Sequence, residues 1–203
     1  MAELPAEGGR WTVVVPAKSP QRGKSRLAAG PEWARALLLD TLDALLATPS
    51  VGRVILVTDD ARAWEAPVGG PRVRIVPDPG SGLNPAVEAG LQAVPAAAGP
   101  VAIVLGDLPG LSAVELDAAL AAAEGAGPLA VPDHDGSGTT MTFAARAGEH
   151  RPCFGAGSFH RHLQAGYAPA PVAPESSLRW DIDVPADVAP ARLGPRTRAL
   201  LLA

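Results

Sequence analysis

The 203-residue sequence has a single cysteine, Cys153, and no long apolar run. One cysteine excludes an internal disulfide and a four-cysteine zinc site, and it favours a reducing compartment, the cytoplasm. The longest apolar runs, such as Val101–Leu105, are far shorter than the ~20 residues of a membrane-spanning helix. The first ten residues contain Glu3 and Glu7 and lack the apolar segment of a signal peptide. We therefore expect a cytoplasmic protein.

The sequence also lacks a surplus of charge. It holds 17 Lys and Arg against 21 Asp and Glu, a formal net charge of −4, and 47% of its residues are hydrophobic. This balance excludes a disordered chain and argues against general nucleic-acid binding. The length suits one large α/β domain. We expect a loose leader over residues 1–10 and one domain over 11–203.

Lysine is scarce: the 17 basic residues are 15 arginines and two lysines. Both lysines, Lys18 and Lys24, fall in one seven-residue stretch near the N-terminus. Unlike arginine, lysine carries a compact, rotatable ammonium that suits phosphate oxygens. The stretch is therefore either a phosphate-binding loop or a solvated basic loop.

Apolar β-branched runs alternate with Ala- and Leu-rich helical patterns, which indicates an α/β fold with a mostly parallel mixed sheet. The predicted strands span residues 11–15, 54–57, 73–76, 101–105, 129–131 and 141–144. The predicted helices span residues 31–46, 85–94, 113–124, 158–165 and 186–193. Asn84 and Ser112 are candidate caps for the second and third of these helices.

The loop after the first strand contains four cations, Lys18, Arg22, Lys24 and Arg26. Gly23-Lys24-Ser25 suggests a P-loop, but that motif needs a glycine where this chain has Lys18. A P-loop kinase is therefore disfavoured. The spacing instead suits a triphosphate or pyrophosphate that is neutralised by side chains.

Two acidic segments are candidate metal ligands. Gly106-Asp107 directly follows the most apolar strand, and the carboxyl ends of parallel strands line the ligand crevice of an open α/β sheet. A carboxylate there suits Mg²⁺, which completes its shell with phosphates and water. Asp181 and Asp183 are two apart and would point to one side of a strand. Asp181 could complete a two-metal site, whereas Asp183 could instead cap a helix that begins at Pro185.

Two glycine-containing segments, 134–140 and 154–158, can bring backbone N–H groups close to anions. Ser158 opens a predicted helix, where it could bind phosphate or act as an N-cap. Together with the basic loop, the two segments suggest two phosphorylated substrates. His160 and His162 are predicted to be surface residues, and Cys153 a structural one.

In this order, five motifs resemble the phosphoenolpyruvate/2-phospho-L-lactate guanylyltransferases of coenzyme F-420 biosynthesis. They are Pro16-Ala17-Lys18 with Lys24-Ser25-Arg26-Leu27, Gly106-Asp107-Leu108-Pro109, Asp135-Gly136-Ser137-Gly138-Thr139, Phe154-Gly155 with Ser158, and Asp181-Ile182-Asp183-Val184-Pro185. The resemblance covers roughly Trp11 to Leu193. It implies a three-layer, Rossmann-like nucleotidyltransferase that joins GTP to a three-carbon phosphate and releases pyrophosphate. With phosphoenolpyruvate the product is enolpyruvoyl-diphospho-guanosine.

The resemblance also implies roles for individual residues. Asp107 and Asp181 would hold Mg²⁺, and Lys18, Lys24 and Arg26 would act on the leaving pyrophosphate. Phosphoenolpyruvate would be bound by Thr139, Gly155 and Ser158, although Thr140 could replace Thr139. The nucleotide would be bound by Pro16, Ala17, Lys18, Lys24, Asn84, Glu88 and Gly106, with Glu88 as a candidate acceptor for guanine N–H groups.

Two questions stay open at this point. A non-catalytic nucleotide-binding module is a rival, but it would not need the paired carboxylates. The acceptor could also be 2-phospho-L-lactate or 3-phospho-D-glycerate; the arginine-rich, lysine-poor composition resembles high-GC actinobacterial chains and favours phosphoenolpyruvate. The sequence does not indicate the oligomeric state.

Overall fold

A seven-stranded sheet forms the centre of this computed structural model, which describes residues 10–17, 30–61, 70–182 and 188–202. The strand order is β3-β2-β1-β4-β6-β5-β7. The strands are β1 (Trp11–Pro16), β2 (Val51–Thr58), β3 (Val73–Pro77), β4 (Val101–Val104), β5 (Leu129–Pro132), β6 (Thr139–Ala144) and β7 (Ala168–Pro169). Within this sheet only β6 is antiparallel to its neighbours, so the predicted mostly parallel mixed sheet is confirmed.

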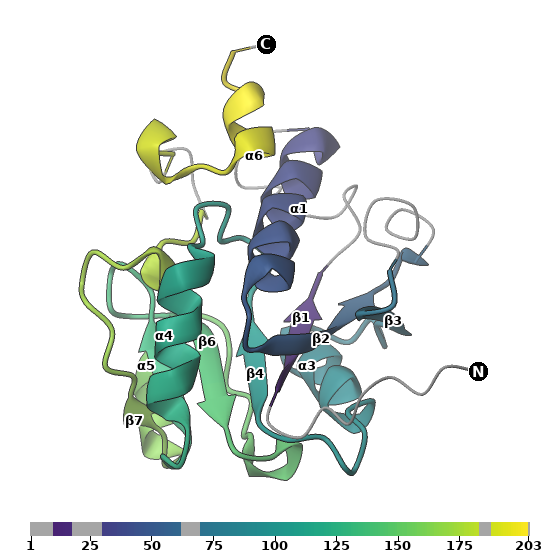
Figure 1. Ribbon diagram of the computed structural model, residues 1–203, viewed down its shortest axis with the longest axis vertical. Coiled ribbons are helices and arrows are strands. Elements are labelled where there is room, and N and C mark those ends of the chain that lie inside the picture. The colour runs from purple at the N-terminus through teal and green to yellow at the C-terminus, as the bar shows by residue number, and fades with distance from the viewer. Residues whose placement is uncertain (1–9, 18–29, 62–69, 183–187, 203) are drawn as a thin grey trace.

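Helices cover both faces of the sheet, with α1 and α4 in front and α3 behind (Figure 1). The α-helices are α1 (Pro31–Ala47), α3 (Leu83–Gln92), α4 (Ala113–Ala123), α5 (Ser158–Gln164) and α6 (Pro195–Ala199). The described residues also form the short 3₁₀ helices η2 (Ala147–Glu149), η3 (Ser177–Arg179) and η5 (Pro190–Arg192). None of the helices in the described ranges is long and apolar enough to cross a membrane.

The side chains of β1 alternate between the two layers of core, as the period of two in a strand requires. Val13 and Val15 pack with α1 and α4, whereas Val14 packs with α3 and with Val57 of β2. Gly90 lets α3 approach the sheet closely, because a Cβ there would lie 2.8 Å from Val57 Cγ2 and closer still to Val14. The predicted three-layer arrangement is therefore present, with one hydrophobic core on each face of the sheet.

Two predicted helix ends differ from the structure. The helix expected from Pro85 begins at Leu83 with Gly82 as its N-cap, so the prediction that Asn84 caps it was wrong. Both polar atoms of the Asn84 side chain instead bond to the backbone of Phe154, at 2.8 and 3.2 Å. The predicted Ser112 cap of α4 is confirmed, because its hydroxyl accepts a bond from the backbone N–H of Glu115 at 3.4 Å.

The C-terminal helix also lies further along than predicted. Of the span 186–193, residues 188–193 contain only the 3₁₀ turn η5, and α6 begins after Gly194. Asp40 of α1 fixes this start: its carboxylate accepts bonds from the backbone N–H groups of Arg196 and Thr197, at 3.1 and 2.8 Å. The hydroxyl of Thr197 donates to the same carboxylate at 2.7 Å. A side chain more than 150 residues away therefore supplies the cap.

A bulge interrupts the pairing of β5 and β6 where β6 begins. Val131 pairs with Met141, but Pro132 pairs with Thr139 and not with Thr140, so β6 contains one extra residue. A bulge re-aims the side chains beside it. Thr139 contacts α5, whereas the hydroxyl of Thr140 donates to the carbonyl of Leu178 in η3.

Candidate active site

The candidate residues gather at one edge of the sheet. Strands β1, β2, β3, β4 and β5 run in one direction, so their carboxyl ends share an edge. Ala17, Asp107 and Asp133 follow β1, β4 and β5 there, and Thr139 begins the antiparallel β6 at the same edge. Ligands of open α/β sheets bind outside this edge.

Asp107 and Asp181 come together through a backbone contact. The N–H of Ile182 donates to the carbonyl of Asp107 at 3.1 Å, which places the two carboxylate-bearing segments side by side. Asp181 is buried, and Asp107 is half-buried. Carboxylate oxygens are hard ligands that suit Mg²⁺ or Mn²⁺. The pair therefore fits a divalent ion whose remaining ligands come from phosphate and water. Among the described residues no larger acidic, histidine or cysteine cluster competes for this role.

Helix α1 holds the turn that carries Asp107. The buried Thr41 hydroxyl accepts a bond from the N–H of Leu108 at 3.1 Å and donates to the carbonyl of Leu37 at 2.9 Å. Leu38 also packs so close to Gly106 that a Cβ at this glycine would lie 2.7 Å from Leu38 Cδ1. Thr41 was not singled out from the sequence, since a threonine inside a helical pattern carries no signal of a partner so far along the chain.

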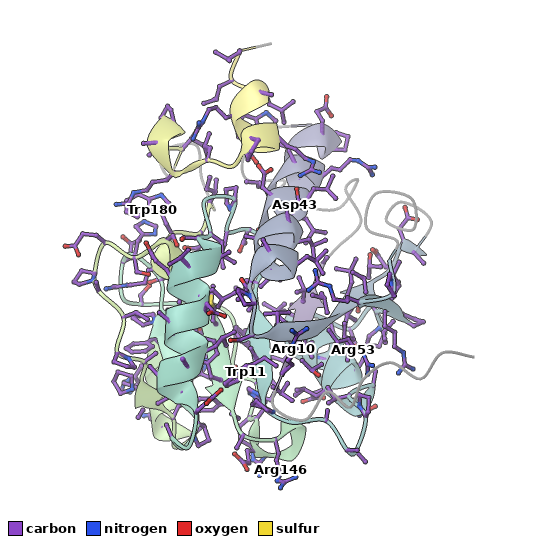
Figure 2. All side chains as sticks on the ribbon, viewed as in Figure 1. Arg10, Trp11, Asp43, Arg53, Arg146 and Trp180 are labelled. Carbon is purple, nitrogen blue, oxygen red and sulfur yellow. The ribbon has the colours of Figure 1, made fainter. Side chains whose placement is uncertain are left out.

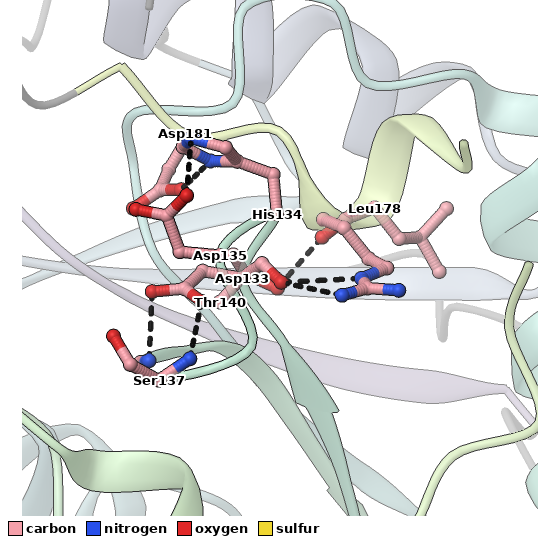
Figure 3. A network of polar contacts seen from close by, with 9 residues as sticks. Asp133, His134, Asp135, Ser137, Thr140, Leu178 and Asp181 are labelled. Atoms are coloured by element: carbon pink, nitrogen blue, oxygen red, sulfur yellow. Dashed lines mark hydrogen bonds and ion pairs between the residues drawn. The ribbon is translucent and has the colours of Figure 1, made fainter. Parts of the chain in front are cut away.

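An aromatic stack lies next to Asp181. The Oδ1 of Asp181 lies 3.5 Å from Nδ1 of His134, whose other ring nitrogen lies 3.4 Å from a carboxylate oxygen of Asp135 (Figure 3). The His134 ring stacks on Trp180 with a centroid distance of 4.6 Å, and the guanidinium carbon of Arg192 lies 3.9 Å from the Trp180 ring. Trp180 lies below the yellow segment that carries η5 and α6 in Figure 2. The His134 side chain, which lies against Asp181, is therefore held by Trp180 on a ring face and by Asp135 at its other ring nitrogen.

Asp133 organises the turn between β5 and β6. Its carboxylate accepts bonds from the N–H groups of Ser137 and Gly138, at 2.9 and 2.7 Å (Figure 3). Its carbonyl accepts two bonds from the Arg179 guanidinium, at 3.2 and 2.9 Å. Arg179 therefore joins this turn to the segment that carries Asp181. Neither Asp133 nor Arg179 was identified as a site residue from the sequence, although each lies just before a segment that was.

The three predicted acceptor residues lie around the start of α5. Thr139 and Ser158 are buried, with 4% and 1% exposed, and Gly155 is exposed. Gly155 has φ +117°, a conformation that L side chains rarely adopt, so a glycine is needed there. The carbonyl of Ser137 accepts a bond from the N–H of Phe159 at 3.1 Å. This bond ties the turn before Thr139 to α5, so the Asp133 turn and the start of α5 are joined directly.

One prediction at this site was wrong, because His162 is fully buried and not on the surface. Its Nδ1 lies 3.0 Å from Oγ1 of Thr139, and its Nε2 lies 3.1 Å from the backbone nitrogen of Cys153. Burial lowers the pKa of His162 to about 4. His160 is exposed, as predicted. Residues two apart on a helix point to different faces, so the two histidines could not share one environment.

The residues predicted to bind the nucleotide are only partly covered by the described ranges. Pro16 ends β1, and the N–H of Ala17 donates to the carbonyl of Val57 at 2.8 Å, next to the end of β2. Asn84 and the exposed Glu88 lie one turn apart on α3. Four of the predicted site residues lie outside the described residues: Lys18, Lys24, Arg26 and Asp183. Residues 1–9 of the predicted leader lie outside them as well.

Comparison with known proteins identifies the class. A family model for the MobA-like NTP transferase domain matches residues 29–199. The solved structure of 4-diphosphocytidyl-2C-methyl-D-erythritol synthase from Anaerococcus prevotii superposes with a TM-score of 0.66, covering 97% of this chain and 98% of that one at 13% identity. The chain therefore contains a MobA-like NTP transferase domain, and its fold is shared with a solved nucleotidyltransferase.

A curated relative narrows the class. The phosphoenolpyruvate guanylyltransferase of Geodermatophilus obscurus is 45% identical over 94% of both chains. This chain therefore belongs to the phosphoenolpyruvate guanylyltransferase family of MobA-like NTP transferases. A structural neighbour, Rv0371c from Mycobacterium tuberculosis, was solved as a complex with manganese (TM-score 0.59, 22% identity, 96% and 98% of the two chains covered).

Proposed function

We propose that this enzyme transfers GMP from GTP to phosphoenolpyruvate, giving enolpyruvoyl-diphospho-guanosine and pyrophosphate. The observation that carries the proposal is the pairing of Asp107 with Asp181 at the carboxyl edge of a nucleotidyltransferase sheet, beside the buried hydroxyls of the acceptor segments. The relative that shares 45% identity carries the name of this activity. By its resemblance to that family, the reaction belongs to coenzyme F-420 biosynthesis. The single cysteine suits a cytoplasmic enzyme.

The chemistry needs no general base. An oxygen of the acceptor phosphate is already an anion, and it attacks the α-phosphorus of GTP. The bond between that phosphorus and the bridging oxygen breaks, and the electron pair leaves with pyrophosphate. The barrier lies in bringing two anions together, so positioning and charge stabilisation dominate.

Asp107 and Asp181 are the residues that would hold Mg²⁺, whose chemistry is to neutralise the α-phosphate as its charge develops. The hydrogen bonds and contacts around the two carboxylates would position them for this role. Thr41 and the Ile182 N–H fix the Asp107 turn, and His134 lies against Asp181. Two carboxylates placed by independent segments would approach the α-phosphate from one edge of the sheet.

Thr139, Gly155 and Ser158 would bind the acceptor acid. The two hydroxyls and the backbone N–H of Gly155 can each donate to a phosphate or carboxylate oxygen. Thr139 suits this role better than Thr140, because the Thr140 hydroxyl donates to the carbonyl of Leu178 at 2.6 Å.

The triphosphate would be bound by Pro16, Ala17 and Gly106 at the ends of β1 and β4, and by Lys18, Lys24 and Arg26. Lysine and arginine side chains would neutralise the leaving pyrophosphate. Asn84 and Glu88 would lie near the guanine, with Glu88 as acceptor for its N–H groups. The side chain of Asn84 already joins α3 to Phe154, so it would link the nucleotide side of the site to the acceptor side.

The test is a product assay with GTP and an equimolar mixture of phosphoenolpyruvate, 2-phospho-L-lactate and 3-phospho-D-glycerate, read by mass spectrometry. We expect pyrophosphate and the guanosine diphosphate ester of phosphoenolpyruvate. A predominant ester of another acid would overturn the acceptor assignment. A kinase would give GDP, and a binding module would give no product, so either result would overturn the proposed function.

A further inference from the structure

We propose that His162 is a positioning residue of the acceptor site, which turns the Thr139 hydroxyl into a hydrogen-bond donor directed at the acceptor acid. The proposal rests on the proposed function in one respect, namely that Thr139 binds that acid. His162 itself would not touch the substrate, because both of its ring nitrogens already face protein atoms, those of Thr139 and Cys153.

The tautomer of His162 follows from one contact. The backbone N–H of Cys153 can only donate, and it lies 3.1 Å from Nε2 of His162. Nε2 must therefore present its lone pair, and a neutral ring then carries its hydrogen on Nδ1. Burial lowers the pKa of this histidine to about 4, so the ring stays neutral near pH 7.

The same tautomer fixes the hydroxyl of Thr139. Nδ1 lies 3.0 Å from Thr139 Oγ1, and because Nδ1 is the donor, the oxygen is the acceptor. The hydroxyl hydrogen cannot point at the imidazole and is turned away from it. A hydroxyl that accepts one bond and keeps its hydrogen for a ligand is a polarised donor, suited to phosphate or carboxylate oxygen.

Neighbouring rings hold the imidazole in place. Phe154 and Tyr167 lie edge-on to His162, with centroid distances of 4.9 and 5.1 Å. Phe154 is in turn held by the two bonds from Asn84 of α3. A ring flip that exchanged the two nitrogens would break the hydrogen bonds to Thr139 and Cys153. The orientation of the Thr139 hydroxyl is therefore built into the core.

The other buried histidine, His150, provides a matched control. Its Nε2 lies 3.0 Å from the carbonyl of Val101, which can only accept, so Nε2 carries the hydrogen and the tautomer is the opposite one. Its Nδ1 faces the hydroxyls of Thr142 and Tyr167, at 3.2 and 3.3 Å. Val101 is the first residue of β4, so His150 lies at the edge of the sheet away from the site.

Two substitutions separate the two bonds of His162. The amide of asparagine reaches the position of Nδ1, so His162→Asn keeps a donor toward Thr139. The amide of glutamine reaches the position of Nε2, so His162→Gln keeps an acceptor for Cys153 and loses that donor. We expect His162→Gln to raise the KM for phosphoenolpyruvate about tenfold with the KM for GTP within about twofold, because one polarised hydrogen bond is lost. We expect His162→Asn to stay within about threefold for both substrates, and His150→Gln to leave both unchanged.

A double-mutant cycle tests the route through Thr139. If His162 acts through that hydroxyl, His162→Gln should have no further effect on acceptor KM in a Thr139→Val background. Equal acceptor KM values for parent and His162→Gln, or additive effects in the cycle, would overturn the proposal. If Thr139→Val itself leaves acceptor KM unchanged, the proposal also fails. Guanylyl transfer would still stand in each case, because product formation by the parent enzyme is measured separately.

The parent protein gives a readout that needs no variant to fold. NMR of ¹⁵N-histidine-labelled protein at pH 7 should show one ring with a hydrogen on Nδ1 and an unprotonated Nε2, which His162→Asn removes. A ring assigned to His162 with its hydrogen on Nε2, or with both nitrogens protonated, would overturn the proposal.

Discussion

The two halves of the site are built in different ways. On the side proposed to hold the metal ion (the metal side), two carboxylates lie on loop segments. Hydrogen bonds of the neighbouring backbone position them: the Ile182 N–H donates to the Asp107 carbonyl, and the Leu108 N–H donates to the Thr41 hydroxyl. On the acceptor side, neutral hydroxyls are buried, and a buried histidine orients one of them. Asp181 is buried and Asp107 half-buried, so their charges need a partner, because an isolated buried charge is costly, whereas a neutral hydroxyl gains direction from burial.

The largest effect should come from breaking the metal side. We expect Asp107→Asn to lower turnover at least ~1,000-fold with the fold intact, because the change keeps the volume and removes one of the two charges proposed to hold the metal ion. Steady-state kinetics and circular dichroism measure the two properties.

Asp117→Asn is the matched control. Asp117 accepts a bond from the backbone N–H of Ser50 at 2.9 Å, before β2 and away from the site, so its variant should keep near-parental turnover. Turnover of Asp107→Asn within about threefold of the parent would contradict the metal role.

The second prediction concerns how the stability of the fold depends on pH through its two buried histidines. Burial lowers the pKa of both His150 and His162 to about 4, against 6.5 in the unfolded chain. Between these values the unfolded chain binds more protons, so stability rises with pH. Stabilisation is complete above about pH 6.5 and is lost as the pH falls to about 4, on the order of 3 kcal/mol per histidine.

Urea unfolding from pH 4 to 8 measures this slope. His150→Asn should flatten it by about half, whereas replacing the exposed His160 by asparagine should leave it unchanged. A parental slope in the His150 variant would show that this histidine is not held neutral.

The third prediction concerns the acceptor side. Ser158→Ala should raise the KM for phosphoenolpyruvate roughly ten- to a hundredfold and leave the KM for GTP nearly unchanged, because a bond to a charged oxygen contributes about 1.5–3 kcal/mol. Thr140→Val is the comparison, since its hydroxyl donates to Leu178 and should affect stability only. A shift in GTP saturation instead would mean that the two subsites are exchanged.

Much of this architecture is predictable because it depends on local patterns. The strands and helices follow apolar periodicity, and Asp107 follows a buried strand whose carboxyl end faces the crevice. The ends of elements are less predictable, because they depend on distant partners. Asn84 has the side chain of an N-cap, yet Phe154 takes both of its polar atoms, and Gly82 caps the helix instead.

The missing parts of the site are also long-range. The bulge that separates Thr139 from Thr140 depends on how β5 and β6 pair, which no local pattern encodes. Sequence therefore left open which threonine faces the acceptor segments. The burial of His162 depends on Phe154 and Tyr167 closing around it, and a seven-residue helix has too few residues to show which face is apolar.

The smallest predicted effect sharpens the comparison from the metal side. Thr41→Val keeps the shape of the side chain but leaves the buried N–H of Leu108 without its acceptor, at a cost of about 1–3 kcal/mol of stability. Because that N–H fixes the turn after Asp107, we expect kcat to fall roughly three- to tenfold with little change in the KM for phosphoenolpyruvate. Thr41→Ser keeps the hydroxyl and should restore kcat. Thr48→Val is the control, because Thr48 is the C-cap of the same helix and its hydroxyl donates to the Ala44 carbonyl at 2.9 Å. Steady-state kinetics and urea unfolding compare the three variants. If Thr48→Val lowers kcat as much as Thr41→Val, the loss reflects a weaker helix and not the placement of Asp107.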